Sequence, residues 1–140
     1  MNLLWRTHFD CDHAEFSSTT NGGGGNGRAG ETWQVAKVSV CNITENHRWL
    51  VVTIPAESTP VIWRAIKDDW LVMCDEAALT MSMRTANIDL RTTTVHKIRF
   101  ASRKEYWSFV ANVTYARVRA YDGGWPNIEQ LNLAGQGSRA

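Results

Sequence analysis

The feature that most constrains the fold is a helix start signal in the last third of the chain. Ser102-Arg103-Lys104-Glu105 is a capping box, in which the serine hydroxyl accepts from the N–H three residues on and the glutamate reaches back. Apolar residues follow at steps of three and four: Tyr106, Phe109, Val110, Val113, Ala116. Asp122-Gly123-Gly124 ends the run. The pattern predicts one long amphipathic helix.

Two β-rich pairs precede this helix. Glu31–Ile43 and His47–Pro55 flank a polar turn and form the clearest hairpin, which Pro55 closes because proline has no N–H for the ladder. Ala77–Thr85 and Thr92–Ala101 predict a second pair, the latter strongly β-branched. The order of strands first and helix last is typical of an α+β domain whose helices cover one face of an antiparallel sheet.

Three further segments carry weaker signals. Leu3–Phe9 and Ala14–Thr19 predict two short strands ahead of a glycine-rich loop at Asn21–Gly27. Residues 56–76 favour a helical turn or two, because apolar residues recur there at helical spacing. These residues are Ile62, Ile66, Trp70 and Met73. Asn127–Leu133 predicts a second, shorter helix.

Length and charge limit the classes of protein to consider. The 140 residues predict a single domain over 1–140, and no apolar window is long enough to span a membrane. Three cysteines, an odd number without a close pair, favour a reducing cytoplasm over a disulfide framework. Residues 84–119 carry eight Lys and Arg against two carboxylates, which predicts either a basic face for an anionic partner or an ordinary solvated surface.

Chemistry-bearing residues outside this pattern are few. His8, Asp10, Cys11, Asp12 and His13 have metal-ligand chemistry, but no second ligand pair at regular spacing accompanies them, so no metal is predicted. The sequence leaves open a catalytic nucleophile in which Cys41 or Cys74 is activated by His47 or His96. Neither cysteine lies in a strand-elbow or helix-start motif of the kind that usually presents such a nucleophile. We therefore expect no catalytic residue, no cofactor and no enzyme activity.

Several stretches resemble the coat proteins of small single-stranded RNA bacteriophages of the levivirus type. The hairpin from Trp33-Gln34-Val35-Ala36 to Arg48-Trp49-Leu50-Val51 resembles their central hairpin. Phe100–Glu105, the long helix and the ending Asn127–Asn132 are similar to their last strand and two helices. The resemblance implies an α+β fold with an N-terminal hairpin and a five-stranded antiparallel sheet, followed by two C-terminal helices that interlock in a dimer.

The function implied by this resemblance is structural. Homodimers would assemble into an icosahedral capsid around viral genomic RNA, giving a virion assembled in the bacterial host cytoplasm, and one RNA hairpin that controls translation would also bind. The inner sheet face would supply the RNA-binding residues: Lys37, Ser39, His47, Trp49, Thr53, Thr92, Thr94. Lysine would contact phosphate and Trp49 would stack on a base. The dimer interface would comprise Tyr106, Phe109, Val110 and Val113.

One alternative from another class remains open. The same residues suit a small cytoplasmic α+β enzyme or ligand-binding protein, in which the tryptophan-rich sheet lines a pocket. Such a protein would remain a small oligomer rather than form a particle, and would gather ionisable groups in a cleft.

Overall fold

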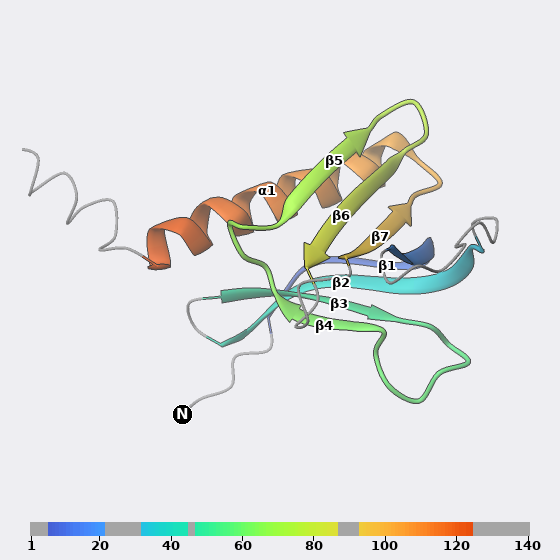
Figure 1. The fold of residues 1–140 in the computed structure, drawn as a ribbon, viewed down its shortest axis with the longest axis horizontal. Helices are drawn as coiled ribbons and strands as arrows, with labels where there is room; N and C mark the ends of the chain where they lie inside the picture. Colours follow the sequence, from blue (N-terminus) through green and yellow to red (C-terminus); the bar gives the residue numbers. More distant parts are fainter. Residues whose placement is uncertain (1–5, 22–31, 45–46, 87–92, 125–140) are drawn as a thin grey trace, which may run out of the picture.

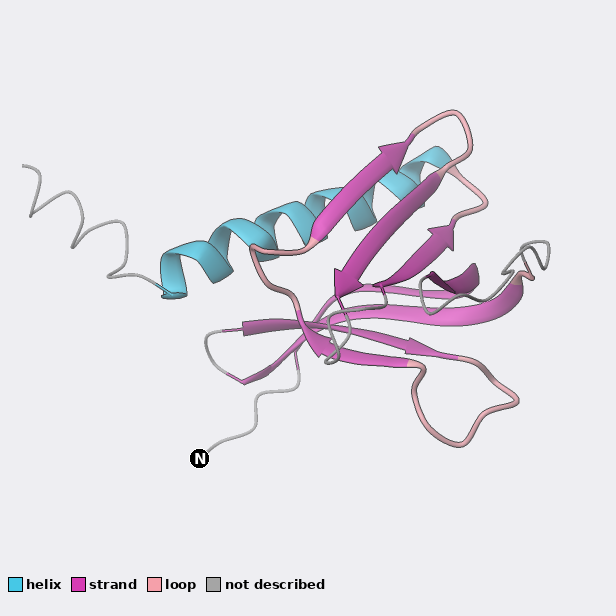
Figure 2. Cartoon of the chain, viewed as in Figure 1, coloured by secondary structure: helices cyan, strands magenta, loops and turns pink. Residues whose placement is uncertain are grey.

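The computed structural model of the chain describes residues 6–21, 32–44, 47–86 and 93–124. Within these ranges, seven strands are followed by one long helix (Figures 1 and 2). The elements are β1 (Arg6–Asn21), β2 (Gln34–Thr44), β3 (His47–Thr53), β4 (Ile62–Ala65), β5 (Leu71–Asp75), β6 (Thr80–Ala86), β7 (Thr93–Arg99) and α1 (Arg103–Gly124). No described helix combines the length and apolar character that crossing a bilayer requires.

All seven strands belong to one antiparallel sheet with β1 at its centre. The strand order is β4-β3-β2-β1-β7-β6-β5. β1 is 16 residues long, and it pairs with β2 from Arg6 to Phe16 and with β7 from Glu15 to Asn21. Because β1 changes its main partner along its length, the sheet bends into two halves that cross, one ending at β4 and the other at β5 (Figure 1).

Irregular pairing in β1 accompanies this bend. Its register to β2 shifts between Thr7 and Phe9 and again between Cys11 and Ala14. Such bulges twist and bend a strand, and they let it serve two half-sheets. Because residues 6–21 form one continuous strand, the N-terminal hairpin predicted from Leu3–Phe9 and Ala14–Thr19 is wrong.

The core lies between the two half-sheets and α1. Each half contributes fully buried apolar side chains from alternate strand positions, and α1 contributes its own apolar stripe. The largest of these side chains are Leu50, Val38, Val40, Val52, Met81, Met83, Ile98, Tyr106, Phe109 and Val113. Phe9, Phe100 and Phe109 join the strands to the helix, with ring centroids 5.0–5.7 Å apart. One chain therefore buries its own helix.

This packing corrects the predicted dimer interface. Tyr106, Phe109 and Val113 are 0% exposed within the single chain, and Val110 packs partly buried against the same core. The expectation of helices that interlock between two chains is wrong, because an amphipathic stripe shows that a helix face is buried but not against which chain. The second predicted helix, Asn127–Leu133, lies outside the described residues.

The predicted start of the helix is confirmed. The backbone N–H of Glu105 donates to Ser102 Oγ at 3.2 Å, and α1 begins at Arg103. The reciprocal contact differs from the expected one, because the Ser102 hydroxyl donates to Glu105 Oε1 at 3.0 Å. This contact orients the glutamate side chain as well as capping the helix.

The predicted strand pairs are partly confirmed. The hairpin of β2 and β3 and the pair of β6 and β7 form as expected. Residues 56–76 hold the short strands β4 and β5 instead of helical turns. Ile62 is buried opposite Val52 in the ladder, and the Ile66 N–H bonds to the Arg48 carbonyl at 2.9 Å, so their apolar spacing reflects edge-strand packing. The expected five-stranded sheet with two helices is therefore wrong.

Candidate functional site

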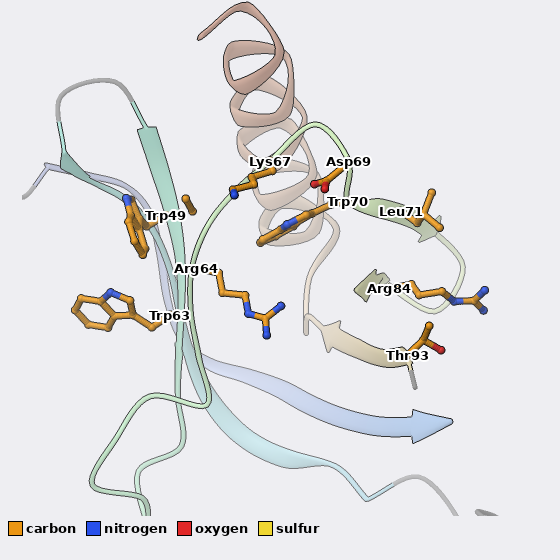
Figure 3. Close-up of a pocket in the computed structure, with 10 residues that line it drawn as sticks. Trp49, Trp63, Arg64, Lys67, Asp69, Trp70, Leu71, Arg84 and Thr93 are labelled. Carbon is orange, nitrogen blue, oxygen red and sulfur yellow. The ribbon is translucent and has the colours of Figure 1, made fainter. Parts of the chain in front are cut away.

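A pocket of about 610 Å³ lies where the two ends of the bent sheet approach each other (Figure 3). Strands β3 and β4 form one wall, the β4–β5 connection closes it, and β5, β6 and β7 contribute the other wall. Its volume falls within the range of small-ligand sites, roughly 300–1,000 Å³. The lining residues are Trp49, Trp63, Arg64, Ala65, Lys67, Asp69, Trp70, Leu71, Arg84 and Thr93.

Two tryptophans form the aromatic end of this pocket. Trp49 pairs with Ala65 and Trp63 pairs with Val51, so both indoles project from the same sheet face as diagonal neighbours. Their centroids lie 6.5 Å apart at 64°, and the small Ala65 side chain leaves room for the rings. Trp63 is 47% exposed, and the buried Trp49 Nε1 has no hydrogen-bond partner among the described residues. The pocket thus offers aromatic surface to a ligand, mainly from the Trp63 ring.

A third tryptophan approaches from the opposite side. Trp70 lies in the β4–β5 connection and is 7% exposed. Its carbonyl accepts a hydrogen bond from Arg117 Nη2 of α1 at 2.8 Å. The helix therefore holds the connection that closes the pocket, because loss of this donor would leave a partly buried carbonyl without its partner.

Three cations give the pocket a positive character. Arg64, Lys67 and Arg84 line it against the single carboxylate of Asp69. Within the described ranges, none of the three cations has a carboxylate at ion-pair distance. In Figure 3, Arg64 lies between the Trp49–Trp63 pair and Arg84, and its guanidinium points away from the two tryptophans. Positive charge beside aromatic surface favours an anionic ligand that also presents an apolar group.

His96 lies near Arg64 but adds no charge at neutral pH. Burial, reinforced by the charge of Arg64, lowers the pKa of His96 to about 4. The ring stacks on Phe16 at 5.8 Å, and Nδ1 lies 3.3 Å from Ser18 Oγ. A neutral imidazole here lets Arg64 keep its position without a second cation beside it.

The residues expected to form an RNA face are only partly brought together. Strand pairing places Lys37 opposite Thr53 and Ser39 opposite Val51, on the same sheet face as Trp49. Lys37 Nζ lies 3.9 Å from Asp10, and the Ser39 hydroxyl donates to the same carboxylate at 2.8 Å. Of this set only Trp49 lines the pocket.

The remaining residues of that set lie elsewhere. His47 is exposed at the start of β3. Thr94 belongs to β7, and its hydroxyl lies 3.2 Å from that of Thr20. Thr92 lies outside the described residues. Apart from Trp49, the described members of this set therefore lie outside the pocket.

The cysteine nucleophile left open by the sequence finds no support. Cys41 lies opposite Trp49 and Cys74 opposite Met81, and no hydrogen bond joins either thiol to a histidine in the described part of the chain. Burial raises the pKa of Cys41 above its ordinary value. A protonated thiol without a base is a poor nucleophile.

Sequence reasoning missed most of the pocket. Four of its residues lie in the segment 56–76, for which the sequence predicts helical turns: Trp63, Arg64, Lys67 and Trp70. Arg84 belongs to the basic run of residues 84–119, which by itself indicates no pocket. The available signal was composition, since aromatic and cationic side chains alternate closely from Trp63 to Trp70. Their convergence depends on the bend in the sheet, which no local pattern specifies.

Comparison with known proteins identifies the fold. No family model matches the chain, and no curated protein matches it. Among solved structures, it is similar to the crystal structure of the Ran-binding domain from the nuclear complex component Nup2 of Ashbya gossypii. The TM-score is 0.62 at 8% identity, covering 83% of this chain and 97% of that chain. The chain therefore has a PH-like fold of the kind found in that Ran-binding domain.

This match overturns the resemblance to phage coat proteins. The Ran-binding domain structure aligns over 97% of its length with this chain. The described part of this chain forms a seven-stranded sheet and a helix that packs on that sheet within the same chain. The expected capsid assembly, viral RNA partner and coat-protein fold are therefore wrong.

Proposed function

We propose that this chain is a protein-interaction domain whose pocket binds an acidic segment bearing an aromatic or large aliphatic side chain. The single observation that carries the proposal is the convergence of Arg64, Lys67 and Arg84 with Trp49 and Trp63 in one cavity. The structural neighbour is named a Ran-binding domain, which supports a protein partner as a class. At 8% identity, that similarity does not carry a particular partner over to this chain.

Charge complementarity selects the acidic segment. The three cations lack carboxylate partners among the described residues, so an incoming carboxylate gains attraction without displacing an internal ion pair. An apolar side chain between the acidic residues would fill the space beside Trp63, which is 47% exposed. Tryptophan and arginine are also the residues most enriched among those that dominate binding energy at interfaces.

We further propose that the domain binds without catalysis. The ionisable groups that line the pocket are three cations and one carboxylate, and no lining residue pairs a nucleophile with a base. The cytoplasmic location favoured by the cysteine usage stays a prediction; the described thiols Cys11, Cys41 and Cys74 are unpaired.

Fluorescence anisotropy of a fluorescein-labelled Glu-Glu-Phe-Glu-Glu peptide tests this proposal. We expect Arg64→Ala, Arg84→Ala and Trp63→Ala each to weaken binding by roughly tenfold to a hundredfold, corresponding to about 1–3 kcal/mol for loss of a central contact. Lys104→Ala and Trp107→Ala are the matched controls, because both side chains are exposed on α1 outside the pocket. They should bind like the parent.

Two outcomes would contradict the proposal. One is equal affinity in Arg64→Ala and Lys104→Ala, which would place the binding charge elsewhere. The other is equal affinity for a Lys-Lys-Phe-Lys-Lys peptide, which would exclude charge selection. Inorganic pyrophosphate serves as a competitor, and tighter binding of pyrophosphate than of peptide would assign the pocket to a small phosphorylated ligand instead.

A further inference from the structure

A second cluster of reactive side chains lies outside the pocket, where β1 meets the first turn of α1. Cys11, His13 and Glu105 bring one ligand atom each to within 4.8 Å of one another. Glu105 Oε2 is the shared centre, 3.3 Å from Cys11 Sγ and 2.8 Å from His13 Nε2. A thiol, an imidazole and a carboxylate are three of the ligand types that zinc prefers.

Two local features of the chain build this cluster. The register of β1 shifts between Cys11 and Ala14, so the strand bulges at the residues that carry the thiol and the imidazole. The capping box places Glu105 in the first turn of α1, where it faces the bulge. The cluster therefore joins residues that lie more than ninety positions apart.

Neighbouring groups already orient two of the three ligands. His13 Nδ1 donates to Asp12 Oδ1 at 3.1 Å, which fixes the ring so that Nε2 faces Glu105 Oε2 at 2.8 Å and is the nitrogen that would give up its proton to a metal ion. The Ser102 hydroxyl donates to Glu105 Oε1 at 3.0 Å and leaves Oε2 to face Cys11 and His13. Supporting hydrogen bonds of this kind are typical around metal ligands, because they fix the orientation and basicity of each ligand.

Access and spacing also suit a metal ion. Cys11 is 4% exposed, whereas the side chains of Glu105 and His13 are 25% and 57% exposed, so one side of the cluster opens to solvent. Bond lengths of about 2.0–2.3 Å to zinc in a tetrahedron place ligand atoms roughly 3.3–3.8 Å apart. Side-chain rotations on the open side can convert the present separations into that geometry.

We propose that Cys11, His13 and Glu105 form a zinc site, with water as the fourth ligand. The thiolate and the imidazole favour zinc over magnesium or calcium, which prefer oxygen ligands alone. As zinc binds, the thiol proton of Cys11 and the Nε2 proton of His13 leave to solvent. The bound ion would tie the central strand of the sheet to the start of the helix, independently of the peptide pocket.

Cobalt substitution of the full chain tests this site directly. The protein is first stripped with a chelator and then titrated with Co²⁺, which reports on thiolate ligation through a sulfur-to-cobalt charge-transfer band in the near ultraviolet. We expect the band to saturate at one equivalent of Co²⁺ and to disappear on addition of Zn²⁺. Cys11→Ala should abolish the band, whereas Cys74→Ala, which removes an exposed thiol elsewhere, should retain it.

Variants of the other residues separate ligation from support. His13→Ala and Glu105→Gln should each weaken Co²⁺ binding at least a hundredfold. Because His13 is exposed, His13→Ala should fold, and it still tests the metal site if Cys11→Ala does not fold. Asp12→Asn should keep the band but weaken binding about tenfold to a hundredfold, as expected for a positioning residue. A parent protein without the band, or a band unaffected by both Cys11→Ala and His13→Ala, would overturn the zinc site and leave a hydrogen-bonded cluster.

Discussion

Replacing Phe109 with alanine tests whether the helix packs on its own sheet. Phe109 is 0% exposed, and its ring centroid lies 5.4 Å from Phe9 and 5.0 Å from Phe100. Removing a buried ring and leaving a cavity costs about 3–5 kcal/mol. Small domains have a free energy of unfolding of about 5–15 kcal/mol, so Phe109→Ala should remain folded only marginally.

Urea denaturation followed by tryptophan fluorescence gives the assay. The midpoint of the parent should be the same at protein concentrations a hundredfold apart, because the helix core lies within one chain. Phe109→Ala should lower the midpoint at both concentrations equally. Trp107→Ala is the control on the same helix; its side chain is 48% exposed and its loss should cost less than about 1 kcal/mol.

Two results would refute this reasoning. A parent midpoint that rises with protein concentration would show that the helix core is shared between chains. A midpoint that Phe109→Ala leaves unchanged would show that the ring is not part of the stabilising core. Only the first result would assign the apolar stripe of α1 to contacts between chains.

Three further predictions follow from single contacts. The pKa of His96 is about 4 in the folded protein, against an ordinary value of 6.5. As pH falls, His96 is therefore protonated in the unfolded state before it is protonated in the folded state, so the free energy of unfolding decreases between pH 6.5 and pH 4. His96→Gln should therefore reduce the stability difference between pH 7 and pH 5 by about 2 kcal/mol relative to the parent, measured by urea denaturation at each pH; an unchanged difference would contradict a buried neutral imidazole. Ser102→Ala should cost about 0.5–2 kcal/mol by removing the helix cap, whereas Ser102→Asp should retain most of the stability, and equal loss in both would argue against capping. Arg117→Met should cost about 1–3 kcal/mol by leaving the Trp70 carbonyl without its donor, and an unchanged denaturation midpoint would show that this contact does not hold the pocket connection.

The parts of the fold that the sequence predicts correctly are those with local causes. The hairpin of β2 and β3 follows from two β-branched runs around a short polar turn. The start of α1 follows from a four-residue capping motif. In each case the deciding residues are close in sequence, so pattern and structure agree.

The parts that the sequence misses depend on long-range packing. β1 runs through the polar Asp10–His13 stretch because bulges there let it pair with both β2 and β7. β4 and β5 are only four and five residues long, and their apolar spacing imitates a helix. The apolar stripe of α1 is the same whether its partner sheet belongs to its own chain or to another.

The same distinction applies to the candidate sites. Trp49 could be singled out early because an aromatic residue in a strong hairpin is visible in the sequence. Trp63 and Arg64 become its neighbours through the pairing of β3 with β4, and Arg84 joins them only when the bent sheet brings β6 near β4. Glu105 was identified as a capping residue, but its contacts with Cys11 and His13 require the helix to dock against the bulge of β1.

The most direct test of the proposed binding function is an NMR titration of the tryptophan indole N–H resonances with the acidic peptide. The resonances are assigned by single tryptophan-to-phenylalanine substitutions. We expect the Trp49 and Trp63 signals to shift in a saturable manner, because both rings line the pocket, while Trp107 on the exposed face of α1 stays fixed. Saturable binding that leaves the Trp49 and Trp63 signals unmoved would show that this pocket is not the site of recognition.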